Sequence, residues 1–253
     1  MVSFGAGSDT RFFRLLQAQP HLAEELVYHE IDFPAISSQK VSAILKGNEA
    51  ERMLSLIGRE RITAVDEGAG LLRSTAYNIH PLDLRELKPG CEMPSGIDPS
   101  LPTLFLSECC LIYLGPEEAD AILKWVTETF RGAVGIVLYE PIGGDDAFGK
   151  VMIQNLAARG IVLRTLKKYS TLSRQKMRLK MLGFGSGQEA VDVEFTYENW
   201  VESGEKERIA GLQMLDEVEE WQLLARHYCI AWGWRGPEFE VWRGKFPLQA
   251  VKG

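Results

Sequence analysis

The sequence contains no apolar run long enough to cross a membrane. A transmembrane helix needs roughly 20 consecutive apolar residues, and no stretch approaches this length. The start of the chain also lacks the charged segment and apolar core of a signal peptide. We therefore expect a protein that makes no membrane contact.

Cysteine is scarce and irregularly placed. The four cysteines, Cys91, Cys109, Cys110 and Cys229, form no CxxC pair, and the four histidines form no HExxH motif. These absences disfavour a disulfide framework and a metal site. The GxSxG turn of serine hydrolases is missing as well. We expect a reduced, cytoplasmic protein in which Cys109 and Cys110 form core or crevice wall rather than a reactive thiol.

An excess of positive charge is also absent. The 28 lysines and arginines are outnumbered by 35 acidic residues, which gives a net charge of -7. This balance disfavours a protein that binds nucleic acid through backbone phosphates. The 45% apolar content is that of an ordinary globular protein. No repeat or linker divides the chain, so residues 1–253 are expected to form one domain, and we expect a monomer.

Short apolar segments alternate with helical patterns over the first 140 residues. Strands are predicted at 2–4, 26–32, 76–79, 103–107 and 133–140, and helices at 11–19, 35–60 and 116–130. This alternation is typical of an α/β fold with a mostly parallel sheet. A helical insertion is predicted at about 143–182, then an acidic helix over 205–226 and a strand over 227–232.

The predicted insertion contains a cluster of basic residues. They are Arg159, Arg164, Lys167, Lys168, Arg174, Lys176, Arg178 and Lys180. The simplest interpretation is a solvated helical face, and the alternative is a docking surface for an acidic partner. The residues alone do not decide between these two interpretations.

A glycine turn lies between the first predicted strand and the first predicted helix. Its sequence runs from Phe4 through Gly5, Ala6 and Gly7 to Thr10. Glycines at this point let the backbone approach a ligand closely, and a helix N-terminus favours anionic groups. Thr10 stands where the dinucleotide fingerprint GxGxxG has its third glycine, so a mononucleoside-type cofactor is favoured over NAD(P).

Carboxylates follow three further predicted strands. Asp32 ends the second strand and is placed to accept hydrogen bonds from ribose hydroxyls, Asp83 follows the third, and Glu108 ends the fourth. Because parallel strands end at one edge of a sheet, the three carboxylates are expected to line one crevice. Such a crevice suits a ligand with hydroxyls, an amine or positive charge. A carboxylate after a strand is also a common helix cap, so the joint pattern is the stronger signal.

One segment matches part of a phosphate-binding loop but is not expected to bind phosphate. The segment from Gly144 to Lys150 matches GxxxxGK and follows a strand, but Val151 has no hydroxyl for magnesium. Asp145 and Asp146 would also place two negative charges where a phosphate must bind. Nucleoside triphosphate binding is therefore not expected.

Several motifs together resemble the leucine carboxyl methyltransferase family. They are FGAGSDTRF at 4–12, HEIDFP at 29–34, LDLREL at 82–87, PTLFLSEC at 102–109, Tyr139-Glu140 with Phe148-Gly149, LDE at 215–217 and HYC at 227–229. They occur in order over nearly the whole chain. The resemblance implies a class I S-adenosylmethionine-dependent methyltransferase with a Rossmann-like sheet. The implied substrate and partner is the C-terminal leucine carboxylate of the type 2A protein phosphatase catalytic subunit.

The resemblance also implies roles for individual residues. It places Gly5, in the turn with Gly7, against the methionine part of the cofactor, and Asp32 at the ribose. Asp83 and Leu84 fall at the adenine, and Glu108 falls near the methionine amine. The insertion corresponds to the family's substrate-recognition lid, and Tyr113 is a candidate for the methyl-transfer site. No proton-shuttling residue is expected, because a carboxylate is already ionised at neutral pH.

One departure from the family pattern leaves alternatives open. Family members begin with a helical segment that brings basic residues to the cofactor and substrate carboxylates, and this chain opens directly on the glycine turn. We expect an open pocket and exposed apolar surface where that segment would pack. A methyltransferase-like interaction module without turnover therefore stays open, as does, more distantly, the related carboxyl methyltransferase of wybutosine synthesis on transfer RNA.

Overall fold

The computed structural model describes residues 1–212 and 216–250. Their strands form one sheet in the order β3-β4-β5-β2-β1-β6-β7-β9-β8. The five strands from β5 to β7 are parallel, and both flanks are antiparallel. The strands are β1 Val2–Phe4, β2 Tyr28–Asp32, β3 Ile62–Asp66, β4 Leu71–Ser74, β5 Tyr77–Pro81, β6 Thr103–Glu108, β7 Val134–Pro141, β8 Gly187–Asp192 and β9 Tyr228–Arg235.

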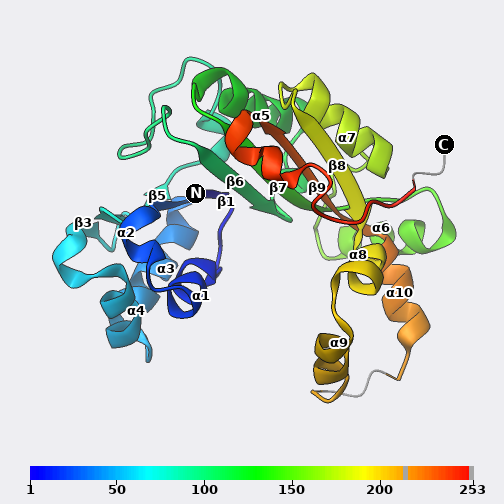
Figure 1. Cartoon of the computed structure of the whole chain (residues 1–253), viewed down its shortest axis with the longest axis horizontal. Helices are drawn as coiled ribbons and strands as arrows, with labels where there is room; N and C mark the ends of the chain where they lie inside the picture. Colours follow the sequence, from blue (N-terminus) through cyan, green and yellow to red (C-terminus); the bar gives the residue numbers. More distant parts are fainter. Residues whose placement is uncertain (213–215, 251–253) are drawn as a thin grey trace.

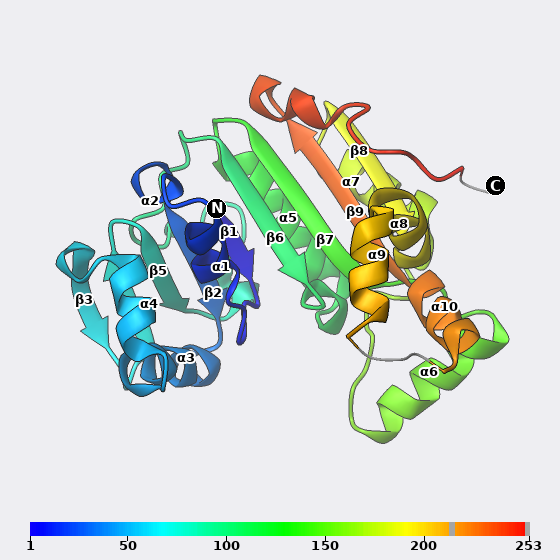
Figure 2. The ribbon, with the colours of Figure 1, turned by 60° about the horizontal axis from the view of Figure 1, so that its bottom comes forward.

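Helices lie on both faces of this sheet (Figures 1 and 2). They are α1 Arg11–Ala18, α2 Leu22–Glu25, α3 Pro34–Lys46, α4 Ala50–Ile57, α5 Pro116–Thr129, α6 Ala147–Ala158, α7 Leu172–Met181, α8 Val193–Trp200, α9 Ser203–Ala210 and α10 Val218–Arg226. Figure 2 shows α5 and α7 behind the sheet and α1 and α8 in front of it. The predicted α/β fold with a mostly parallel sheet is confirmed.

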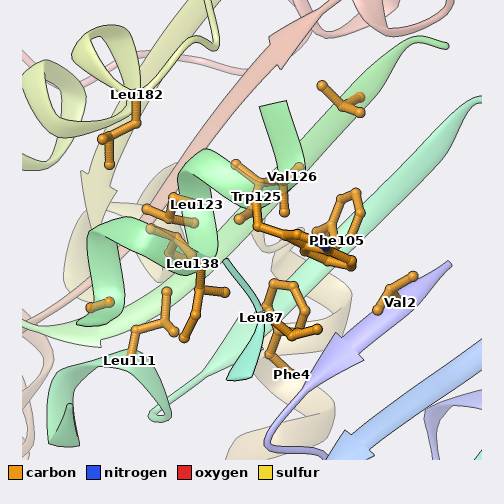
Figure 3. Packing of buried hydrophobic residues seen from close by; sticks show 14 of the residues in the cluster. Val2, Phe4, Leu87, Phe105, Leu111, Leu123, Trp125, Val126, Leu138 and Leu182 are labelled. Carbon is orange, nitrogen blue, oxygen red and sulfur yellow. The ribbon is translucent and has the colours of Figure 1, made fainter. Parts of the chain in front are cut away.

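The largest apolar cluster lies between the central strands and α5 (Figure 3). Phe105 of β6 packs 5.5 Å from Phe4 of β1 and 4.9 Å from Phe130, between ring centroids. Trp125 of α5 is fully buried against the same rings. A second cluster joins α1, α3 and α4 to β2, β4 and β5 on the opposite face. These two layers hold the parallel strands rigidly, so the position of each strand's end is well defined.

Part of the front face lies between α1 and α8 without a helix over it (Figure 2). Here β6 presents Leu104 and Leu106, and β7 presents Val137 and Tyr139, and all four side chains are only half-buried. Leu106 and Val137 are paired across the two strands. These four side chains therefore form an apolar strip on the central strands.

Several elements differ from the sequence prediction. The antiparallel strands β3 and β4 and the edge strand β8 were not predicted, because their side chains are half exposed and show no continuous apolar run. The helix predicted over 35–60 is divided into α3 and α4 at Gly47. The acidic helix predicted over 205–226 is also two helices, since α9 ends at Ala210 and α10 begins at Val218, with residues 213–215 outside the described part.

The predicted insertion at 143–182 contributes to two different parts of the molecule. Helix α7 packs against β8, β9 and the main cluster through Leu179. Helix α6 buries only Gly149 and lies away from the sheet beside α10 (Figure 2). The residues of this stretch therefore form both a layer of the core and an outer element.

The basic cluster of this stretch is not one solvated face. The Arg178 side chain is fully buried, 3.5 Å from a Glu140 carboxylate oxygen and 3.2 Å from an Asp120 oxygen. Its guanidinium also lies over the Tyr169 ring, 4.2 Å from the centroid. Lys168 and Lys176 form ion pairs with Asp120 and Glu189. The interpretation as a solvated face is therefore wrong for Arg178, because helical periodicity alone does not show which basic residue of α7 turns inward.

Candidate active site

The parallel strands β1, β2, β5 and β6 end at the same edge of the sheet, and a crevice lies there. A cavity of about 210 Å³ is lined by Gly5, Asp32, Phe33, Leu82, Asp83, Leu84, Cys109, Cys110, Tyr113 and Leu114. The structure thus places five of the seven predicted site residues around one cavity, although they come from four separate segments. The carboxyl edge of a parallel sheet is where α/β proteins bind nucleotide-type ligands.

A second cavity of about 340 Å³ adjoins the first at Gly5. Its lining includes Ser3 of β1, Asp9, Arg11 and Arg14 around α1, and Glu108 at the end of β6. Gly5 lines both cavities. The crevice therefore consists of two neighbouring cavities that share Gly5: Asp32 and Asp83 line the first, and Glu108 lines the second.

The glycine turn is shaped by close contacts that exclude a side chain. Gly5 has φ +61°, and a Cβ built there would lie 2.4 Å from the Cys110 sulfur. Its N–H donates to the Ile31 carbonyl at 2.8 Å, which ties the turn to β2. Any other residue at Gly5 would therefore push Cys110 away from the turn and change the shape of the cavity wall.

Gly7 has a different role. Its N–H donates to Asp32 Oδ2 at 2.7 Å, and it lines a separate cavity between α1 and α3 rather than the crevice. The second Asp32 oxygen accepts from the Phe33 N–H at 2.7 Å. The Asp32 carboxylate thus holds the turn in place, and each oxygen keeps a further lone pair for a ligand hydroxyl.

Asp83 also lines the first cavity. It precedes the short helix η2, Leu84–Glu86, and accepts hydrogen bonds from the Arg85 N–H and guanidinium. The side-chain hydrogen bond from Arg85 lowers the pKa of Asp83, so the group is ionised at neutral pH. Leu84 beside it is buried in the main cluster and presents an apolar wall. This wall offers an ionised acceptor next to apolar surface, which suits a heteroaromatic base with an amino group.

Glu108 and Arg11 form an ion pair across the second cavity. Arg11 Nη2 lies 2.9 Å from Glu108 Oε2, and their side chains are 36% and 63% exposed. Arg11 Nη1 also donates to Asp9 Oδ2 at 2.7 Å. The ion pair therefore joins the start of α1 to the end of β6 at the mouth of the crevice.

The segment after Glu108 forms the floor of the crevice. Cys109 adopts φ +46°, a strained conformation for a residue other than glycine, and its N–H donates to the Tyr139 carbonyl. The chain then enters the short helix η3, Leu111–Tyr113, which places the half-exposed Tyr113 ring at the cavity. Burial raises the pKa of Cys109 to about 11 and that of Cys110 to about 12. Both thiols are protonated at neutral pH and serve as crevice wall, as the sequence predicts.

The GxxxxGK segment does not form a phosphate site. Asp146 caps α6 by accepting from the Gly149 N–H at 2.7 Å, and it also contacts His227 at 3.1 Å. A carboxylate therefore stands at the helix N-terminus where a phosphate would have to bind. His227 is buried and links α6 to the start of β9.

Arg11 and Arg14 are site residues that the sequence reasoning did not single out. Both lie in α1 and line the second cavity, and Arg14 is exposed. The signal for them is their spacing: residues three apart in a helix share a face, and the helix begins directly after the glycine turn.

Within residues 1–212 and 216–250, no group of three or more His, Cys, Asp or Glu side chains is placed to hold a metal ion. In the same part of the chain, every helix is too short or too polar to cross a bilayer.

Solved structures resemble this fold at low sequence identity. An inferred O-methyltransferase from Nostoc punctiforme matches with a TM-score of 0.51 and 9% identity, over 92% of this chain and 50% of the other. PigF with SAH matches with a TM-score of 0.50 and 13% identity, over 92% and 49% of the two chains. At these identities the likeness extends to the fold alone, and it agrees with the predicted methyltransferase fold.

Sequence relatives are much closer. Proteins named leucine carboxyl methyltransferase 1 match at 46% identity in Aspergillus fumigatus and 48% in Emericella nidulans, over 92% and 93% of this chain. The chain spans 65% of the length of each. The protein of that name in Schizosaccharomyces pombe is 43% identical over 91% of this chain and 71% of its own length. The model of the leucine carboxyl methyltransferase family matches residues 1–127. The chain therefore belongs to the leucine carboxyl methyltransferase family.

Proposed function

We propose that this chain transfers a methyl group from S-adenosyl-L-methionine to the α-carboxylate of a C-terminal leucine in the type 2A protein phosphatase catalytic subunit. The main support is the crevice in which Gly5, Asp32, Asp83, Leu84 and Tyr113 line one cavity in a chain of this family. S-adenosyl-L-methionine is the cofactor that the family and the fold support.

The residues of the crevice fit the parts of this cofactor. Gly5 lets Cys110 pack directly against the turn, and a Cβ there would displace this wall of the cavity proposed for the thioether chain. Asp32 is placed for ribose hydroxyls, and Asp83 with Leu84 is placed for adenine. Glu108 supplies a carboxylate at the far end for an amine. When bound, the cofactor supplies an electrophilic methyl group on a sulfonium.

The protein's own contribution is alignment. The acceptor carboxylate is ionised at neutral pH and needs no base, and the thiols beside the cavity are protonated there. The strained turn at Cys109 lies between Glu108, which lines the second cavity, and Tyr113, which lines the first. Holding the acceptor oxygen in line with the methyl carbon is worth several orders of magnitude in rate.

A protein acceptor also fits the outer helices. Val218, Leu223 and Leu224 of α10 are each more than 40% exposed, although they are large and apolar. Exposed apolar patches of this kind mark contact sites for other molecules. We propose that they contact the phosphatase and that the chain acts as a monomer in the cytoplasm.

The test is transfer of labelled methyl from S-adenosyl-L-methionine to the phosphatase catalytic subunit with and without its terminal leucine. We expect label only in the intact subunit, and alkali should release it, because a carboxyl methyl ester is base-labile. The rate should not depend on a side chain that titrates near pH 7. A bell-shaped rate profile would contradict the alignment mechanism.

Two other outcomes would favour the alternatives. Phosphatase binding without label in either substrate would indicate an interaction module without turnover. Label in transfer RNA and none in the phosphatase would indicate the wybutosine-type reaction.

A further inference from the structure

A polar cluster lies outside the crevice, on the face of the sheet that carries the main apolar cluster. Side chains alternate between the two faces along a strand, and Leu72 and Ile79 belong to the second apolar cluster. Arg73 of β4 and His80 of β5, which follow them, therefore point to the other face. Both line a cavity of about 460 Å³ between these strands and the segment 86–95.

Apolar side chains form much of the lining of this cavity. They are Leu71, Pro81, Leu82, Leu87, Met93 and Pro94. Leu87 is buried in the main cluster, which fixes the inner wall. A cavity of this size, with apolar walls and few polar groups, is the usual form of a small-molecule site.

The histidines beside the cavity are neutral. Arg73 Nη1 lies 2.9 Å from His80 Nδ1, and a guanidinium can only donate, so Nδ1 accepts. His80 then has its proton on Nε2 and donates it to His29 Nδ1 at 3.0 Å. Burial, with Arg73 nearby, lowers the pKa of His29 to about 3 and that of His80 to about 2. Arg73 is therefore the charged member of the cluster.

Arg73 lacks a counter-ion among the residues that the structure describes. Its side chain is half-buried, and Nη1 donates to the Ile79 carbonyl at 3.3 Å as well as to His80. In the same part of the chain, its Nε and Nη2 have no hydrogen-bond partner. Burial lowers the pKa of Arg73, and no carboxylate opposes the shift. An anion bound beside the guanidinium would restore the interactions that burial removes.

Two exposed glutamates decide which kind of anion fits. Glu86 and Glu92 line the same cavity, and their charges repel an anion in proportion to its own charge. A phosphate dianion is therefore disfavoured relative to a monoanion, and it has no apolar part for the cavity walls. A carboxylate has one charge and two oxygens, which match the planar fork of a guanidinium.

We propose that the cavity between β4, β5 and residues 86–95 binds a small monocarboxylate with an apolar body. The carboxylate pairs with Arg73, and the apolar body lies against Leu87 and Met93. Leu82 lines both this cavity and the first cavity of the crevice. The site is therefore separate from the proposed cofactor site and shares one wall residue with it.

The test is binding of three probes to the full chain, measured by calorimetry and by the histidine ring signals in NMR spectra. Hexanoate has the charge and the apolar body, hexanamide has the apolar body alone, and inorganic phosphate has charge alone. We expect hexanoate to bind at least about tenfold more tightly than the other two. Hexanoate should shift the ring signals of His80, assigned with His80→Gln, and leave those of the exposed His21 in place.

Variants separate the role of the charge from the role of the fold. Arg73→Gln should weaken hexanoate binding about tenfold to a hundredfold, the usual loss for a charge-assisted hydrogen bond, and Arg73→Lys should weaken it less. Glu92→Gln should tighten hexanoate binding about twofold, because it removes a repulsive charge. The matched control is Arg59→Gln, which breaks an exposed ion pair with Glu51 outside the cavity lining and should change nothing.

Other results would overturn the proposal. They are no saturation by hexanoate up to about 10 mM, equal affinity for hexanamide, or unchanged affinity in a folded Arg73→Gln variant. If Arg73→Gln does not fold, weaker hexanoate binding in Glu92→Gln would contradict the proposal in its place. Competition by S-adenosylhomocysteine would place hexanoate in the crevice. Methyl transfer is not measured, so failure of the phosphatase proposal would leave these results interpretable.

Discussion

Two arginine–glutamate pairs occupy opposite environments in this molecule. Arg178 and Glu140 join α7 to β7 with both side chains fully buried, whereas Arg11 and Glu108 join α1 to β6 at the mouth of the crevice. Both glutamates lie near the carboxyl ends of neighbouring strands, β6 and β7. The same two residue types therefore serve different purposes within a short distance.

The difference lies in the surrounding atoms. Arg178 is enclosed by Glu140, Asp120 and the Tyr169 ring. Burial raises the pKa of Glu140, and the Arg178 guanidinium opposes that shift. Arg11 faces water on one side and keeps an open cavity beside it. A buried pair fixes the position of a helix against a strand, whereas an exposed pair contributes little to stability.

The largest expected effect is on the free energy of unfolding when the arginine of each pair is replaced. Arg178→Ala should lower the free energy of unfolding by about 3–5 kcal/mol, because it leaves the Glu140 carboxylate buried without its partner. Arg11→Gln should lower it by less than about 1 kcal/mol, the usual value for an exposed pair. Urea unfolding of both variants measures the difference. Similar losses in the two variants would show that the pairs are not distinct.

A buried cluster of two histidines and Arg73 makes stability depend on pH, which gives a second contrast with the exposed ion pair. His29 Nδ1 lies 3.0 Å from His80 Nε2, and Arg73 contacts His80 at 2.9 Å. Burial, with the chain's amino terminus and Arg73, lowers the pKa of His29 to about 3. Burial, with Arg73 and His29, lowers that of His80 to about 2. The folded chain therefore keeps both histidines neutral where an unfolded chain would protonate them.

The sign of the pH dependence follows from these shifts. Below about pH 6.5, the ordinary histidine value, the unfolded chain binds protons that the folded chain excludes. Stability should thus fall with decreasing pH, by about 2 kcal/mol per histidine between pH 7 and pH 5. His80→Gln should flatten the curve, and His21→Gln, on the surface, should not. Equal curves for His80→Gln and the wild type would contradict this account.

Alanine substitutions in the glycine turn should have the smallest effect on stability. Only the substitution at Gly5 should also weaken ligand binding. Both Gly5 and Gly7 have positive φ, so alanine at either position should cost about 1–2 kcal/mol in backbone strain. Only at Gly5 does a Cβ meet Cys110, whereas none of the neighbouring atoms lies within 4 Å of a Cβ at Gly7. Gly5→Ala should weaken S-adenosylhomocysteine binding by at least about tenfold. An equal loss of affinity in Gly7→Ala would show that backbone strain, rather than the contact of the new Cβ with Cys110, weakens binding.

The sequence predicted the crevice better than the periphery. Strands such as 103–107 and 133–140 read as continuous apolar runs because one face is buried and the other face presents a half-buried apolar strip. The ends of β2, β5 and β6 place Asp32, Asp83 and Glu108 at one edge of the sheet. Edge strands β3 and β8 alternate weakly because one side meets solvent, and sequence reasoning missed them. The pairing of strands that lie far apart in the chain leaves no pattern in the local sequence.

The same limit applies to individual side chains. Periodicity places Arg178 on a basic helix, but only the packing of α7 against β7 and α5 shows that it turns inward. The contact between Arg11 and Glu108 is similarly invisible, because each residue alone is an ordinary surface charge. Gly7 was grouped with Gly5 in the turn, and the structure separates them by which cavity each one lines.

The placement of β9 has a consequence for the order of folding during synthesis. Strand β9 lies between β7 and β8, although β8 precedes it in the chain. Within the described residues, β8 pairs with β9 alone. On the ribosome, the segment Gly187–Asp192 must therefore wait, unpaired, until some forty further residues have emerged. The strands from β1 to β7 can pair earlier, so we expect the flank formed by β9 and β8 to be the last part of the sheet to assemble.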